Sequence, residues 1–412
     1  MAKIPFQSLT KTDLAALLRH LSPEGERGDK QARYRAKQIF HWVYQRHVAG
    51  FDEMTDLSKE SRAWLAEHVE LCTLPVATSQ QALDGTHKFL WKLPDAKTIE
   101  SVIIPAALQE KTDFDDDRAM PEARFSGKMA RDEAKQNLAS DQWKRLTACI
   151  SSQVGCAMAC KFCLTGIQGL DRHLKTEEIV TQVHELRKRA PITNIVFMGM
   201  GEPLHNLDAV SKACQILIDQ DGLGFSKRKV TVSTSGLVPA IEELGRRVDV
   251  SLAISLNATT DEVRSEIMPV NRKWNLAALM KACREYPLGP HRRITFEYVL
   301  LRGLNDSLED ASRIITLTRG IPSKVNLIPF NAHPGADFQR PDDSTVRAFQ
   351  RYLLDRGVTA TVRISRGRDI LAACGQLRSV FGTARGTDRH KDFRPGLEAS
   401  SPSGLAGTAS GS

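Results

Sequence analysis

A regular alternation of strand-like and helix-like segments after residue 145 constrains the fold of this chain most strongly. The β-rich runs are NIVFMGM, KVTVSTSG, VDVSLAISLNA, RRITFEYVLL, KVNLIPFN and TATVRISRG, and each is followed by a helical pattern or a capped start, such as Thr259 to Glu262 or Asp306 to Glu309. This alternation predicts an α/β fold with a mainly parallel sheet, either doubly wound or a barrel. In either fold, functional side chains are expected at the carboxyl ends of the strands.

The rest of the chain shows other sequence patterns. Residues 1–72 hold three amphipathic helical patterns and predict a small accessory domain, and residues 73–105 alternate around a DG turn, which predicts a short antiparallel meander as a linker. Residues 106–144 lack a sustained apolar face and are interpreted as an exposed insertion. Residues 145–384 form the α/β domain, and residues 385–412, rich in Gly, Ser and Pro, are expected to be a disordered tail.

Composition narrows the class of protein. The 412 residues are 41% hydrophobic and 26% charged, which is typical of a globular protein. No apolar run approaches the roughly 18 residues of a membrane span, and the N-terminus lacks the apolar stretch of a signal peptide, so we expect no membrane association and a cytoplasmic location. The net charge of +8 favours polyanionic partners, although a basic enzyme without such a partner remains the alternative.

Three of the eight cysteines, Cys156, Cys160 and Cys163, fall on one short loop after an expected strand. Structural zinc usually takes four protein ligands in paired knuckles, and the chain has no second C-x-x-C pair. A disulfide is disfavoured in a reducing compartment. An iron–sulfur cluster remains, and because a cluster ordinarily takes four cysteines, three would leave one iron open to a small molecule.

This cysteine spacing, C-x3-C-x2-C with Phe162 before the third cysteine, resembles the signature of the radical S-adenosylmethionine (SAM) enzymes. The resemblance implies a partial (β/α)6 barrel with one [4Fe-4S] cluster and SAM as cofactors. The segment MGMGEP then corresponds to the superfamily's motif for the SAM amino group. It contributes Gly201 and Glu202, and the other expected SAM contacts at strand ends are Ser233, Ser255, Leu256, Asn257 and Asn331. Without the cysteines, each would pass for an ordinary turn or cap residue.

Longer motifs narrow the resemblance to one family. The segments ACISSQVGCAMACKFCLTG, FMGMGEPLHNL, KRKVTVSTSGLVPAI, VNLIPFN and DILAACGQL, in this order, resemble the RlmN dual-specificity RNA methyltransferases between about residues 30 and 385. The family methylates C2 of adenine 2503 in 23S rRNA and C2 of adenine 37 in tRNAs, using two SAM molecules and a methyl-cysteine. The implied partners are 23S rRNA, tRNA, an external electron donor such as flavodoxin and a thiol reductant, with the chain acting as a monomer.

The family resemblance also implies roles for three further residues. Cys374 corresponds to the cysteine that carries the methyl group, Cys149 to the cysteine that forms a disulfide with it, and Glu100 to the proton acceptor. Taken alone, both cysteines would pass for small core residues and Glu100 for an exposed strand residue. Asn257 departs from the family, in which Ser-Leu-His is the commoner sequence; asparagine keeps hydrogen bonding but loses a titratable ring.

Two alternatives for function stay open from the sequence. The sister family Cfr methylates C8 of the same rRNA adenine, and pocket geometry decides between C2 and C8. A non-catalytic RNA-binding or iron–sulfur electron-transfer protein is the second alternative. The segment RYRAKQIFHWVYQRH mixes cations with aromatic side chains, as an RNA-binding helix would, but a helix with aromatic groups in the core and charges in solvent fits it equally.

Overall fold

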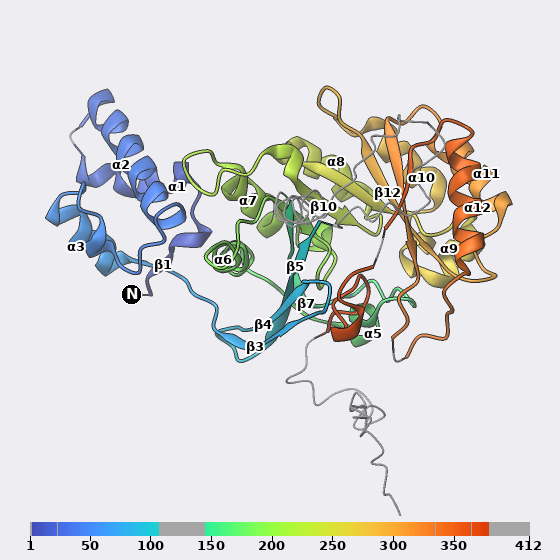
Figure 1. The fold of residues 1–412 in the computed structure, drawn as a ribbon. Helices are drawn as coiled ribbons and strands as arrows, with labels where there is room; N and C mark the ends of the chain where they lie inside the picture. Colours follow the sequence, from blue (N-terminus) through green and yellow to red (C-terminus); the bar gives the residue numbers. More distant parts are fainter. Residues whose placement is uncertain (1, 23, 107–144, 334, 364, 379–412) are drawn as a thin grey trace, which may run out of the picture. The chain divides into compact units, whose positions relative to one another are not determined.

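The computed structural model describes residues 2–22, 24–106, 145–333, 335–363 and 365–378 (Figure 1). The expected insertion, apart from residue 106, and the expected tail lie outside the described residues. Within the described part of the chain, no helix is long and apolar enough to cross a bilayer.

One 10-stranded sheet organises the fold, in the order β14-β13-β12-β11-β10-β9-β6-β5-β4-β3. Within this sheet, β6 and the strands β9 to β14 pair in parallel with one another, each with its neighbour in this order. These strands are β6 (Leu146–Cys149), β9 (Asn194–Phe197), β10 (Val230–Thr234), β11 (Ser251–Ser255), β12 (Ile294–Leu300), β13 (Ser323–Pro329) and β14 (Ala360–Val362). The expected strand runs and the mainly parallel sheet of an α/β fold are confirmed, with β14 extending the parallel edge beyond six strands.

Amphipathic helices follow the parallel strands. They are α6 (Thr176–Arg187), α7 (Leu207–Ile218), α8 (Val238–Arg247), α9 (Asp261–Ile267), α10 (Leu276–Glu285), α11 (Leu308–Thr318) and α12 (Asp343–Leu354). In α8, for example, Ile241 and Leu244 are fully buried, whereas Glu243 and Arg247 pair on the outer face. The apolar face of such a helix packs on the sheet because burial of its side chains stabilises the fold.

The two expected capping positions are each wrong by one residue. Helix α9 is capped by Thr260 and α11 by Ser307, whose hydroxyl oxygens accept the backbone N–H groups of Val263 and Asp310. The hydroxyl of Thr259 contacts α11 instead, where it donates to Asp310 Oδ1 at 2.5 Å and accepts a hydrogen bond from Arg313 Nε at 2.9 Å.

The meander consists of β3 (Val76–Gln81), β4 (His87–Lys92) and β5 (Thr98–Pro105) and continues the same sheet (Figure 1). Strand β5 pairs antiparallel with β6, and Val102 lies opposite Cys149. Directly opposite residues share a face, and side chains two positions apart do so as well. Glu100 and Cys149 therefore lie on one face of the sheet, on neighbouring strands.

The helical segment at the N-terminus contains α1 (Lys11–Leu17), α2 (Glu26–Tyr44) and α3 (Lys59–His68). A short parallel pair, β1 (Ile4–Pro5) with β2 (Val69–Glu70), joins its ends. Contacts attach this segment to the barrel: Lys11 Nζ lies 3.1 Å from Asp219 Oδ1 and 2.6 Å from Asp221 Oδ2 beyond α7. The rings of Tyr44 and His184 also meet edge to face, with centroids 5.5 Å apart.

Candidate active site

The three-cysteine loop follows a short hairpin strand. Strand β7 (Gln153–Gly155) ends just before Cys156, and α5 (Leu164–Gln168) begins just after Cys163. Gly155 has φ of +77°, and a Cβ there would lie 1.9 Å from the carbonyl oxygen of Gly169, so a side chain cannot be accommodated. The expected position of the loop directly after a strand is confirmed, but that strand belongs to the β7–β8 hairpin and not to the parallel sheet.

The three thiols are buried or nearly so and interact with one another electrostatically. Burial raises the pKa of Cys156 to about 12, and burial, reinforced by the neighbouring thiols, raises the pKa of Cys160 well above its usual value. Burial also raises the pKa of Cys163. As free thiols they stay protonated, and binding of a cationic metal centre would supply the charge needed to deprotonate them.

Within the described residues, no three His, Cys, Asp or Glu side chains converge closely enough to hold a single metal ion. A [4Fe-4S] cube differs from a single ion because each thiolate binds its own corner iron, so the sulfurs need to surround the cube rather than meet at a point. A buried set of three thiols lining a common cavity fits this requirement.

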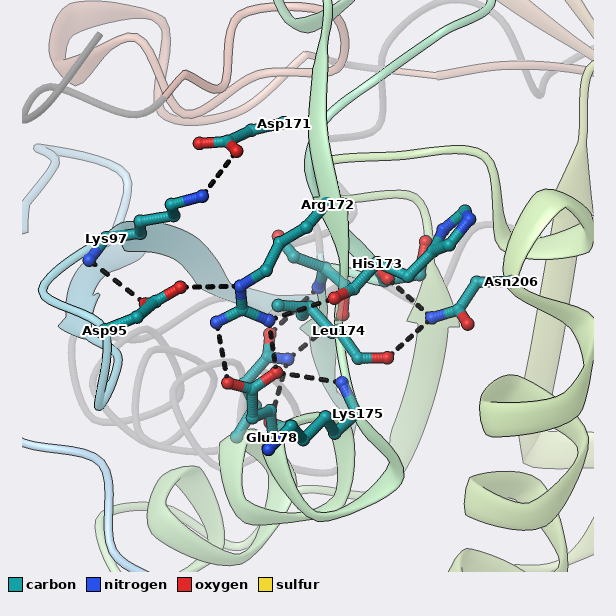
Figure 2. Close-up of polar contacts among 12 residues, drawn as sticks. Asp95, Lys97, Asp171, Arg172, His173, Leu174, Lys175, Glu178 and Asn206 are labelled. Atoms are coloured by element: carbon teal, nitrogen blue, oxygen red, sulfur yellow. Dashed lines mark hydrogen bonds and ion pairs between the residues drawn. The ribbon is translucent and has the colours of Figure 1, made fainter.

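Polar contacts hold the hairpin beneath the loop (Figure 2). Strand β8 (Leu170–His173) pairs with β7, and its Arg172 binds both carboxylate oxygens of Glu178 at 2.8 Å. Arg172 Nε also donates to Asp95 Oδ2 at 2.7 Å, in the turn between β4 and β5, and Lys97 pairs with Asp171 nearby. The hairpin is therefore attached both to helix α6 and to the meander.

A single cavity brings most of the expected site residues together. Its lining includes Cys156, Cys160, Cys163, Gly201, Glu202, Ser233, Ser255, Asn257, Asn331 and Cys374. Three expected residues, Leu256, Glu100 and Cys149, are not part of this lining. Leu256 is fully buried, and its backbone N–H donates to Glu297 O at 2.9 Å, so it shapes the strand end rather than the cavity wall.

Glu202 presents a buried carboxylate, with 3% of its surface exposed. Its oxygens accept the backbone N–H groups of Leu204 at 3.0 Å and Ser235 at 2.7 Å. Burial raises the pKa of Glu202, and these hydrogen bonds lower it in part. In the described part of the chain no cationic nitrogen pairs with it within 4.0 Å, which leaves the carboxylate available for an ammonium group.

The side chain of Asn257 makes hydrogen bonds within the protein. It adopts a left-handed backbone with φ of +55°, which asparagine tolerates better than most residues. Its Oδ1 accepts the backbone N–H of Val299 at 2.8 Å, and its Nδ2 lies 3.3 Å from Met268 Sδ. The departure from the family's histidine is therefore compatible with a well-formed strand end.

The segment around Cys374 is attached to the three-cysteine loop and to the end of β13. Asn331 Nδ2 donates to Cys374 O at 3.3 Å, and the backbone N–H of Leu164 donates to Gly375 O at 2.7 Å. Thr165 Oγ1 donates to Leu377 O at 2.5 Å. These bonds hold Cys374 at the cavity wall. The next residue, Gly375, accepts a hydrogen bond from Leu164, the first residue of α5.

Cys149 and Cys374 lie near enough to interact electrostatically. Cys149 is 4% exposed, and burial, followed by the neighbouring Cys374, raises its pKa to about 12. Arg363 interacts with both sulfurs and with Glu297, and it lines the cavity. Sequence reasoning missed Arg363 and Glu297; an acidic residue inside the apolar strand run RRITFEYVLL was the available signal for Glu297.

Glu100 lies on the strand next to that of Cys149, on the same face of the sheet. It is 2% exposed, and its Oε1 lies 3.2 Å from Lys88 Nζ. Burial raises the pKa of Glu100, and the charge of Lys88 lowers it by a smaller amount. The alternative of an exposed strand residue is therefore wrong.

Helix α2 divides its aromatic residues between core and surface. Tyr44 is fully buried, and Trp42 donates from Nε1 to Asp56 at 2.6 Å, whereas Tyr34 is 62% exposed. Of the nearby cations, Arg46 stacks on Trp42 and Lys37 pairs with Asp221 at 3.1 Å. The surface that this helix offers to a polyanion is thus smaller than its sequence suggests.

Two family models match the chain. Residues 150–315 match the radical SAM superfamily, and residues 10–71 match the ribosomal RNA large subunit methyltransferase N-terminal domain. The chain resembles a radical SAM methyltransferase from Sphaerobacter thermophilus, with a TM-score of 0.74 and 40% identity over 91% of this chain and 99% of that one.

Relatives of established name match most of the chain. A dual-specificity RNA methyltransferase RlmN from Geobacter sulfurreducens is 51% identical over 85% of this chain and 88% of its own length. One from Geotalea uraniireducens is 47% identical over 93% of this chain and 99% of its own length. With the three-cysteine loop, the Glu202 turn and Cys374 on one cavity, the chain belongs to the RlmN family of dual-specificity RNA methyltransferases in the radical SAM superfamily.

Proposed function

We propose that this chain methylates C2 of adenine 2503 in 23S rRNA and of adenine 37 in tRNAs, through a methyl group carried on Cys374. The observation that carries the proposal is one cavity lined by Cys374 and by the loop of Cys156, Cys160 and Cys163. Adenine C2 is an electron-poor ring carbon that does not attack a methyl donor as an amine or thiolate does. A radical reaction beside a thiol that carries the methyl group removes the need for C2 to act as a nucleophile.

The residues present fit the two cofactors of the superfamily. Cys156, Cys160 and Cys163 would hold the cluster, and Glu202 would receive the SAM ammonium group, with the cavity side chains Ser233, Ser255, Asn257 and Asn331 around the rest of the molecule. When bound, these groups supply a methyl group and a 5′-deoxyadenosyl radical.

Cys374 acts first as a nucleophile. Its thiol must lose a proton before its sulfur can accept a methyl group, and the guanidinium of Arg363 stabilises the resulting thiolate electrostatically. One C–H bond of this methyl group must break before its carbon can bond to C2 of the adenine, and the 5′-deoxyadenosyl radical that the bound cofactors would supply would take up that hydrogen atom. The RNA would then be held covalently, through this carbon, on Cys374 Sγ.

Glu100 and Cys149 complete the reaction. Glu100 accepts the proton lost from C2, a role for which a buried carboxylate with a raised pKa is suited. As the carbon–sulfur bond breaks, the Cys149 thiol loses its proton and bonds to Cys374 Sγ, and a proton completes the methyl group on C2. The electron left over from the radical addition would return to the cluster, which leaves a disulfide and releases the methylated RNA. An external thiol reductant restores the two thiols by exchange.

The proposed partners follow from this chemistry and from charge. A low-potential electron donor such as flavodoxin would serve the cluster, and the exposed cations of α2, including Arg33, would contact RNA phosphates. We propose that the chain acts as a cytoplasmic monomer. The boundaries 1–72, 73–105, 106–144, 145–384 and 385–412 remain the proposed division of the chain.

Anaerobic reconstitution with iron, sulfide, a reductant and methyl-labelled SAM, in the presence of a 23S rRNA fragment, tests the proposal. Nucleoside mass spectrometry is expected to find 2-methyladenosine. Membership in the RlmN family weighs against the Cfr-type product, and 8-methyladenosine would establish that alternative instead. A reduced cluster that leaves SAM intact would favour a binding or electron-transfer protein.

A further inference from the structure

Arg264 on helix α9 is a fully buried cation, with no exposed surface. Its guanidinium donates to four acceptors: Leu256 O at 3.0 Å, Asn271 Oδ1 at 3.0 Å, Ser235 O at 2.7 Å and Ser255 O at 3.0 Å. All four acceptors are neutral. Among the described residues no carboxylate oxygen pairs with Arg264 within 4.0 Å.

These hydrogen bonds lie where the cavity is built. Ser235 follows strand β10 and Ser255 ends β11, and both line the cavity together with the cysteine loop. Arg264 therefore fixes two neighbouring strand ends through their carbonyl groups. Neutral acceptors do not by themselves require a cationic donor, so the charge of Arg264 can serve a further role.

Burial of a cation without an ion pair costs free energy, even when all its donors are bonded. Burial lowers the pKa of Arg264 to about 10, so the side chain stays protonated at neutral pH. The groups that act on it electrostatically are the Cys160 thiol, Asp261 and Cys283. Of these, Cys160 belongs to the loop that would gain negative charge on binding metal.

Backbone contacts keep the cysteine loop and α9 together. The N–H of Lys161, the residue after Cys160, donates to Ile267 O at the end of α9 at 3.0 Å. The interaction between Arg264 and Cys160 is reciprocal, because Arg264 in turn lowers the pKa of the Cys160 thiol against the larger effect of burial. The cation is thus held on a helix whose end contacts the residue after one expected cluster ligand, and it acts electrostatically on that ligand.

We propose that Arg264 is a positioning residue that supplies a fixed positive charge beside the iron–sulfur cluster and makes the cluster easier to reduce. The inference rests on the proposed function, which places the cluster on Cys156, Cys160 and Cys163. One-electron reduction by an external low-potential donor adds one negative charge to the cluster. A buried cation nearby stabilises the reduced form more than the oxidised form and so raises the reduction potential.

The test compares the full chain with Arg264→Lys and Arg264→Gln after anaerobic reconstitution. A dye-mediated redox titration followed by electron paramagnetic resonance gives the midpoint potential of the cluster. We expect Arg264→Gln to move the potential to more negative values and Arg264→Lys to keep it near the value of the parent chain. Arg313→Gln, which removes a cation from α11 that pairs with Asp310, is the matched control and is expected to leave the potential unchanged.

A purely structural role for Arg264 predicts a different pattern. Lysine and glutamine would then change the potential equally, or neither would change it, and the proposal would be overturned. If Arg264→Gln does not retain a cluster, Asn271→Asp carries the test, because it places a carboxylate on Nη1 without removing the guanidinium; an unchanged potential there also overturns the proposal. Absence of a cluster from the parent chain would instead refute the proposed function.

Discussion

The backbone N–H of Arg378 donates to Glu100 Oε2 at 2.9 Å, across 278 positions of sequence. This bond attaches strand β5 to the segment that carries Cys374, so the proposed proton acceptor and the proposed methyl carrier belong to one connected unit. Burial raises the pKa of Glu100, although Lys88 and Arg378 both lower it in part. The Glu100 carboxylate can accept a proton only when it is ionised, which requires a pH above its raised pKa.

The pH dependence of product release tests this role. Below the raised pKa, Glu100 is protonated and cannot accept the C2 proton, so release of methylated RNA is expected to increase as pH rises through that pKa and then to level off. Glu100→Gln should lose this acidic limb and accumulate covalent RNA–protein adduct, as measured by denaturing gels over a pH series. If the pH dependence of RNA release is unchanged in this variant, Glu100 only anchors the segment that carries Cys374.

Substitution of the two cysteines separates their roles. Cys149→Ala is expected to trap the RNA on the protein, because the carrier sulfur then has no partner to displace the RNA. Cys374→Ala is expected to give no adduct, because no methyl group is loaded. Denaturing gels with labelled RNA measure both outcomes. Cys214→Ala, at a fully buried thiol on α7, is the control and should behave as the parent chain does; an adduct in Cys374→Ala would contradict the assignment.

Arg363 is expected to assist methyl transfer to Cys374. The interaction with Cys374 is the largest influence on the pKa of Arg363 and raises it, which reflects a mutual attraction of thiolate and guanidinium. Arg363→Gln should slow methylation of the protein in the absence of RNA by about tenfold, the effect of losing roughly 1.4 kcal/mol of electrostatic stabilisation of the thiolate, whereas Arg363→Lys should retain most of the rate.

Incorporation of labelled methyl into the reconstituted protein measures this rate. Arg366→Gln is the matched control, because Arg366 comes from the same segment but binds Asp84 O at 3.0 Å instead. Equal rates for the parent chain and Arg363→Gln would contradict the assignment.

Local sequence patterns were sufficient to predict much of the fold and part of the candidate site. The strand runs from NIVFMGM onward are each bounded by a helix, and in a parallel sheet their ends must meet at one edge. Glu202, Ser233 and Asn331 therefore reach one cavity together with the cysteine loop. The resemblance supplied Cys374, which no local pattern distinguishes from a core cysteine.

Long-range contacts account for what the sequence could not show. The Thr259 hydroxyl bonds to Asp310, 51 positions away, while Thr260 caps α9, and Glu100 is buried because β5 continues the barrel sheet beside β6. Arg264 and Arg363 look like surface cations in sequence because their burial depends on strands and loops distant in the chain. Such positions become visible only when the partners are placed in space.

Asn257 is expected to matter for stability as well as for ligand binding. Asn257→Leu leaves the backbone N–H of Val299 without its acceptor and places a less suitable residue at a positive φ, which should lower the free energy of unfolding by about 1–3 kcal/mol. Urea denaturation of the cluster-free chain measures this loss. Asn257→His should be tolerated better because histidine also adopts this conformation; a larger loss in the histidine variant would contradict the assignment.

Arg172 is expected to stabilise the base of the cysteine hairpin more than its neighbour Lys97 does (Figure 2). The Glu178 side chain is 6% exposed, so Arg172→Met would leave a buried carboxylate without its bidentate partner and should lower the free energy of unfolding by about 1–3 kcal/mol. The pair of Lys97 with Asp171 is about 30% exposed on both sides, and exposed pairs contribute little, so Lys97→Met should cost less than about 1 kcal/mol. Urea denaturation of both variants in parallel measures the difference. Equal losses would mean that the hairpin is held by its backbone pairing with β7 and by apolar packing, and that the Arg172 contacts add no more than an exposed ion pair does.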